Sequence, residues 1–138
     1  TGGEIVFRKY SPVGELGSFA EEYASSLFRI SRCPSVICDR DSVIAFSGTV
    51  KKETENRALS DEMLALITGR AFYAAGADEI YLTQGGGRRV VCSAPIIANG
   101  EAIGAVVLLM PEEGIKLGEA ETKLVLAAAD FLSKCTDY

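Results

Sequence analysis

The chain has 138 residues, enough for one domain that buries roughly two-thirds of the surface exposed by its unfolded form. Its 48% hydrophobic and 24% charged residues are typical of a globular protein, and a net charge of −5 without a basic run argues against a grip on nucleic acid by this segment alone. Four cysteines without a C-x-x-C pair, and no histidine, disfavour a metal site and remove the commonest general base.

The first residues predict a strand and then a helix. The alternating segment from Glu4 to Tyr10 looks like the last strand of a domain cut off upstream, so we expect a fragment of a longer protein. Ser11 predicts a helix N-cap with Pro12 at the first helical position, and Cys33-Pro34 ends the helix. Its apolar stripe consists of Leu16, Phe19, Ala20, Tyr23, Ala24, Leu27 and Ile30.

A hairpin and a second helix follow. Two β-rich runs, Ser35 to Cys38 and Ser42 to Ser47, flank a polar tip and predict the hairpin. The charged segment from Lys51 to Arg57 reads as a loop or a short helical turn. Ser60 predicts the N-cap of the second helix, and Gly76 its C-terminal stop.

Three strands and a final helix complete the chain. The strands are expected at Ile80 to Gln84, Arg88 to Ala98 and Ala102 to Met110, with Asn99-Gly100 as a type I′ turn and Gly104 as a bulge or a close backbone approach. The apolar run that ends at Met110 is far shorter than the about 20 residues that span a bilayer, so we expect no membrane anchor. Helical spacing joins Leu117, Ala120, Leu124, Ala127, Ala128, Phe131 and Cys135.

Helices and hairpin-joined strands in this order predict the α+β class, with helices covering an antiparallel sheet. Glycines at 85–87 beside Arg88 and Arg89 suggest either a phosphate-binding loop or a hairpin tip. A dinucleotide-binding loop must open a helix, whereas a strand follows here, so we favour the hairpin tip.

The cysteines allow two interpretations. A catalytic thiol needs a neighbouring base or cation to form the thiolate, and Arg89 is the nearest cation to Cys92 in sequence. Free cysteines are otherwise among the most buried residue types, so we expect buried structural thiols. Without a secretory signal, a reducing cytoplasm is the expected location.

Aromatic and hydroxyl side chains suggest a small-molecule pocket between the second helix and the sheet, although ordinary core packing explains the same pattern. The pocket candidates are Phe46, Ser47, Phe72, Tyr73, Tyr81, Thr83 and Ser93.

The first and last helices carry wide apolar stripes, which either cover the sheet or also meet a second copy of the chain. Ala129 beside the main stripe of the last helix favours the second interpretation. The interface candidates for such a homodimer are Phe19, Tyr23, Leu27, Leu124, Ala128 and Phe131.

Several motifs together resemble the stage V sporulation protein T family of AbrB-type transcription regulators. They are Phe7 to Pro12, Glu15 to Gly17, Phe19 to Ala24, Ile37 to Asp41, Ser47-Gly48, Lys51-Lys52, Pro95 to Gly100 and Ile103 to Val107. The likeness covers nearly the whole chain, and it departs around Ala77 to Arg89, where the connection is short and rich in glycine.

This resemblance implies that residues 11–138 form a GAF-like regulatory domain with an antiparallel sheet of about five to six strands, its first and last helices packed together and a further helix on the sheet. Residues 1–10 would be the tail of an AbrB-type DNA-binding domain. It also implies a non-catalytic sensory and oligomerisation domain of a sporulation regulator, which forms higher oligomers at full length and binds DNA only through the upstream domain. The resemblance implies no cofactor.

A small-molecule effector would act by changing the packing of the first and last helices. The alternatives are a ligand-free dimerisation module, and a GAF-fold thiol reductase using Cys33, Cys38 or Cys92.

Overall fold

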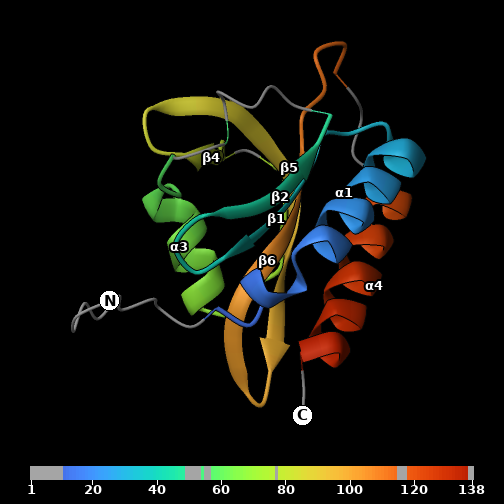
Figure 1. Ribbon diagram of the computed structural model, residues 1–138. Coiled ribbons are helices and arrows are strands. Elements are labelled where there is room, and N and C mark those ends of the chain that lie inside the picture. The colour runs from blue at the N-terminus through green and yellow to red at the C-terminus, as the bar shows by residue number, and fades with distance from the viewer. Residues whose placement is uncertain (1–10, 49–53, 55–56, 77, 115–117, 137–138) are drawn as a thin grey trace, which may run out of the picture.

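In the computed structural model, which describes residues 11–48, 54, 57–76, 78–114 and 118–136, an antiparallel sheet lies between two helical layers (Figure 1). Its strands follow the order β2-β1-β6-β5-β3, and β4 pairs with β5 outside this path. In chain order the elements are a 3-10 turn (Gly14–Leu16), α1 (Ser18–Ser31), β1 (Ser35–Asp39), β2 (Val43–Ser47), α3 (Asp61–Thr68), β3 (Tyr73–Ala74), β4 (Tyr81–Thr83), β5 (Gly86–Ala98), β6 (Glu101–Leu109) and α4 (Glu119–Thr136). The expected α+β architecture is confirmed.

The two faces of the sheet carry separate hydrophobic cores. Helices α1 and α4 lie side by side on one face, and α3 covers the other (Figure 1). Buried side chains of the first core include Ala24, Leu27 and Leu132 from the two long helices. The second core includes Met63 and Ile67 from α3. Both faces of β6 are therefore buried, which explains its continuous apolar run.

The central β5–β6 hairpin follows the predicted turn. Asn99 has φ 52° and Gly100 has φ 78°, as a type I′ turn requires. A register irregularity at Ile96/Ile97 lies next to Gly104, which pairs with Asp39 of β1. A Cβ at Gly104 would overlap the carbonyl oxygen of Cys38, so the expected close backbone approach is present.

The first helix begins later than predicted. Ser11 Oγ accepts a hydrogen bond from the Gly14 N–H at 2.9 Å, so it binds the first N–H of the 3-10 turn and no N–H of α1. Gly17, with φ 50° and ψ −124°, interrupts the helical backbone, and α1 starts at Ser18. The prediction that Ser11 and Pro12 open the long helix is therefore wrong.

The second helix is shorter than predicted. Ser60 Oγ accepts from the Met63 N–H at 3.1 Å, which confirms the N-cap. The helix then ends at Gly69, because Arg70 adopts a left-handed conformation with φ 54°. Gly76 is not the C-terminal stop, since Tyr73–Ala74 already pairs with β5 as strand β3.

The β4–β5 connection is a hairpin tip, as favoured over an anion loop. Thr83 pairs with Gly86 and Tyr81 with Arg89, and Gly85 turns the chain at φ 85°. The predictions for residues 1–10, for most of Lys51 to Arg57 and for Leu117 lie outside the described residues.

Replacing Gly104 tests the packing of β1 against β6. We expect Gly104→Ala to lower the free energy of unfolding by more than about 2 kcal/mol, because the methyl group must push two backbones apart. Gly76→Ala is the matched control, since open space surrounds that position, and its effect should stay within about 0.5 kcal/mol. Urea denaturation followed by circular dichroism measures both, and equal stabilities would contradict the close approach.

Candidate functional site

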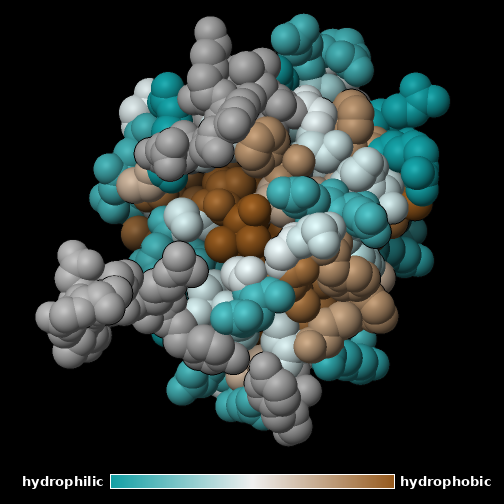
Figure 2. Space-filling view, viewed as in Figure 1, coloured by the Kyte–Doolittle hydropathy of each residue, from teal (hydrophilic) through white to brown (hydrophobic). Residues whose placement is uncertain are grey.

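The space between α3 and the sheet, where the sequence suggests a pocket, has a packed interior. Met63 and Ile67 from α3 are buried against side chains such as Leu82, Val90 and Val107. Toward the edge of the sheet this core is less covered, and Figure 2 shows apolar side chains at the surface between α3 and the β1–β2 hairpin. Partly buried residues that pack against this core include Val43, Phe46 and Leu64.

Three of the pocket candidates lie on this face of the sheet or beside it. Tyr73 and Ser93 are direct partners across β3 and β5, and Ser93 is buried. Phe46 packs against the margin of the same core. Tyr73 directs its hydroxyl outward, where it donates to the Asp78 carbonyl at 3.1 Å. This is the core-packing arrangement, with a tyrosine hydroxyl at the surface.

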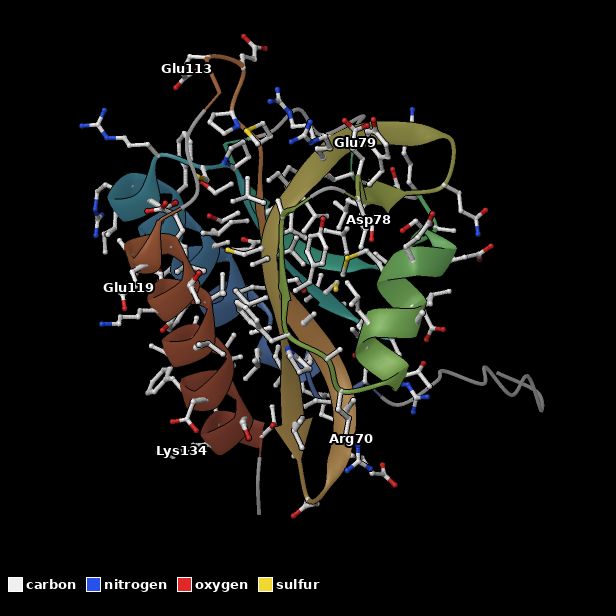
Figure 3. All side chains as sticks on the ribbon, turned by 180° about the vertical axis from the view of Figure 1, so that it is seen from behind. Arg70, Asp78, Glu79, Glu113, Glu119 and Lys134 are labelled. Carbon is white, nitrogen blue, oxygen red and sulfur yellow. The ribbon has the colours of Figure 1, made fainter. Side chains whose placement is uncertain are left out.

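Of the other four candidates, Tyr81 shares the neighbours Glu79 and Arg89 with Tyr73, and the remaining three lie in other places. Tyr81 donates to Glu79 at 3.1 Å, near the β4–β5 hairpin where Figure 3 labels Glu79. Thr83 is buried in β4, and Ser47 ends β2. Phe72 is 40% exposed and lines a groove between β5 and α4. The seven side chains do not converge on one cavity.

Helices α1 and α4 each carry apolar residues on two faces. One face of each helix packs on the sheet, and further apolar side chains lie beside that face, where they are exposed or partly buried. We call the outward surface the α1–α4 face; it consists of Phe19, Tyr23, Ile30, Leu124, Ala127 and Phe131.

An aromatic cluster forms the centre of the α1–α4 face. The ring centroids of Tyr23 and Phe131 lie 5.7 Å apart in a stacked arrangement, and Phe19 lies 6.2 Å from Tyr23 and 6.1 Å from Phe131. Phe19 is nevertheless 41% exposed and Phe131 45% exposed. Exposed apolar clusters of this kind mark interaction sites in proteins.

Two of the six interface candidates lie elsewhere. Leu27 and Ala128 are buried in the core of the single chain, so they have no surface to offer a partner. Ala129, taken as a sign of surplus apolar surface, is buried as well. The helical spacing identifies apolar positions, but two apolar faces on one helix hide which of them meets the sheet.

Three cysteines are buried, as expected, and the fourth is exposed. Burial raises the pKa of Cys38 and that of Cys92 to about 12, and it also raises the pKa of Cys33. The thiol of Cys92 contacts the Glu121 carbonyl at 3.7 Å, and no cation among the described residues lowers its pKa. Cys135 was expected to be buried as well, and this prediction is wrong.

No helix in the described part of the chain is long and apolar enough to cross a membrane.

Solved structures share this fold. A GAF domain of an Acinetobacter phosphoenolpyruvate-protein phosphotransferase superimposes with a TM-score of 0.63 at 11% identity, covering 93% of this chain and 83% of its own. The corresponding domain from Coxiella burnetii gives 0.64 at 18% identity, with coverages of 86% and 80%. A type II free methionine-R-sulfoxide reductase from Thermoplasma acidophilum gives 0.57 at 12% identity, with coverages of 88% and 94%. At these identities the likeness establishes the GAF fold alone.

Sequence similarity is more specific. Stage V sporulation protein T of Bacillus subtilis (strain 168) is 38% identical over 135 residues, which cover 96% of this chain and 75% of that protein. Residues 15–136 match the model of the family described as "Stage V sporulation protein T C-terminal, transcription factor". The chain therefore belongs to the family of stage V sporulation protein T C-terminal domains, and it is a regulatory domain with a GAF fold.

Proposed function

We propose that this domain is a non-catalytic oligomerisation module of a cytoplasmic sporulation regulator, and that it forms a homodimer through the α1–α4 face. The observation that carries the proposal is the exposed aromatic cluster of Phe19, Tyr23 and Phe131 on two helices that already bury their other faces against the sheet. A helix that needs only to cover a sheet gains nothing from a second apolar face.

The chemistry of the face suits contact between helices. Small side chains, Ala120 and Ala127, precede Phe131 along α4 and would allow a partner helix to approach closely. Charged pairs lie at the ends of α4, where Lys123 approaches Glu119 at 3.9 Å and Lys134 approaches Asp130 at 3.2 Å. An apolar centre with a polar margin is the usual anatomy of a protein interface. Burying the exposed half of each phenylalanine contributes about 1 kcal/mol per ring.

The regulatory consequence follows from the position of α1 in the chain. In our proposal a DNA-binding domain precedes Ser11, so a dimer of α1 helices sets the distance between two such domains, and the full-length protein assembles further through both domains. A small-molecule effector would act on this arrangement by favouring one packing of α1 and α4 over another, since equal affinity for both packings would shift nothing.

A thiol reductase is the alternative that the fold of one structural neighbour raises. The raised pKa values of Cys33, Cys38 and Cys92 speak against it, because the thiol form is a poor nucleophile. We therefore keep the non-catalytic interpretation.

Replacing the two exposed rings tests the dimer. The wild-type chain should dimerise at micromolar concentration, and Phe19→Ser with Phe131→Ser should weaken dimerisation at least tenfold, because the apolar centre of the interface is lost. Sedimentation equilibrium over a range of concentrations measures the change.

Phe72→Ser is the matched control, since Phe72 has a similar exposure and lies in the groove between β5 and α4. It should dimerise like the wild type. A wild-type chain that stays monomeric, or a control as weak as the double variant, would contradict the α1–α4 face as the interface.

Alkylation rates test the non-catalytic interpretation. At pH 8 a thiol of pKa about 12 is thiolate in only about one molecule in ten thousand, so native Cys38 and Cys92 should react with iodoacetamide at least a hundredfold more slowly than exposed Cys135. Raising the pH should increase the reactivity of native Cys38 and Cys92 up to the point of unfolding. Mass spectrometry of tryptic peptides assigns each site, and unfolding in urea should make all four react. Rapid reaction of native Cys33, Cys38 or Cys92 near neutral pH would favour the reductase.

A further inference from the structure

A cavity of about 350 Å³ lies where the chain enters the domain, and no residue of the α1–α4 face lines it. Four parts of the fold meet around it: Ser11 and Pro12 of the entering chain, the tip of the β1–β2 hairpin, the tip of the β5–β6 hairpin and Thr136 at the end of α4. Its size is within the range of small-molecule sites.

Asp39 is the buried polar group of this cavity. It is 9% exposed, and its Oδ1 accepts hydrogen bonds from the N–H groups of Asp41 at 2.7 Å and Ser42 at 2.8 Å. Its Oδ2 accepts one from Ser11 Oγ at 2.9 Å, so a donor that reaches this oxygen from the cavity would weaken the hydrogen bond to Ser11. The same carboxylate thus borders the cavity and holds the entering chain.

The lining favours one class of ligand. Ala98, Ala102 and Ile103 are nearly buried and make an apolar wall. Among the described residues, the charged side chains that line it are the carboxylates of Asp39, Asp41 and Glu101 and the guanidinium of Arg40. The C-terminal end of α4, at Thr136, adds the negative end of a helix dipole. A cation with a short apolar body matches both the wall and the charge.

We propose that this cavity binds a small organic ammonium ion with a short apolar body, and that its occupation loosens the contact between Asp39 and Ser11. The ammonium donates to Asp39 Oδ2 and to Glu101, and its carbon chain lies on Ala98 and Ile103. Because Ser11 Oγ donates to the same oxygen, ligand and chain compete for it. The site goes beyond the dimer proposed above, and neither depends on the other.

Titration of the 138-residue chain with 3-methylbutylammonium chloride, followed by ¹⁵N NMR, tests the site. We expect saturable shifts confined to the entering chain, the two hairpin tips and the end of α4. The neutral isostere 3-methylbutan-1-ol and the anion 4-methylpentanoate should bind at least tenfold more weakly, since neither offers a cation to the carboxylates. Equal binding of the alcohol, shifts elsewhere, or no binding of the amine would overturn the proposal.

Two variants test separately the charge of the site and the coupling of ligand binding to the contact between Asp39 and Ser11. Glu101→Gln should weaken amine binding three- to tenfold, whereas Glu62→Gln, which changes another exposed glutamate, on α3, should leave it unchanged. Ser11→Ala removes the competing donor and should strengthen amine binding two- to fivefold. An unchanged affinity in Glu101→Gln would overturn the site, and an unchanged or lower affinity in Ser11→Ala would overturn the coupling. Sedimentation of the same samples measures the dimer separately, so failure of one proposal is distinguishable from failure of the other.

Discussion

The close approach of β6 to β1 at Gly104 is the contact on which the rest of the fold depends. It joins two local hairpins, β1–β2 and β5–β6, into one sheet. Only a residue without a side chain lets the Cys38 carbonyl lie so near the β6 backbone. Because the sheet separates the two hydrophobic cores, the seating of α1 and α4 on one face and of α3 on the other both follow from this pairing.

Helices α1 and α4 carry more apolar side chains than they need to cover the sheet. Burial of Ala20, Ala24 and Leu27 already fixes α1, yet Phe19 and Tyr23 add a second apolar surface beside Phe131. Exposed aromatic rings cost solubility and do little for the stability of one chain. The dimer that we propose would cover this surface with the same surface of a second copy.

The sequence predicts those features that rest on local chemistry. The turn at Asn99-Gly100, the cap at Ser60 and the close approach at Gly104 each follow from residue types at fixed spacing. The end of α3 does not follow from such local spacing, because tertiary contacts decide the left-handed conformation of Arg70 and the pairing of β3 with β5. The pocket and interface candidates were chosen by residue spacing. Such spacing identifies apolar residues, but it does not tell which face of a helix or strand the rest of the chain covers.

The cavity at the chain entry shows how far this limit reaches. Its lining comes from segments separated by more than a hundred residues, so no local pattern could bring Ser11 and Thr136 together. Asp39 follows Cys38, whose carbonyl lies against Gly104. The pairing of β1 with β6 thereby places the Asp39 carboxylate beside Ser11. A displacement of β1 against β6 would move Asp39 and with it the first turn of the chain. The contact that builds the sheet therefore also positions Ser11, whose Oγ binds both Asp39 and the first N–H of the 3-10 turn that precedes α1.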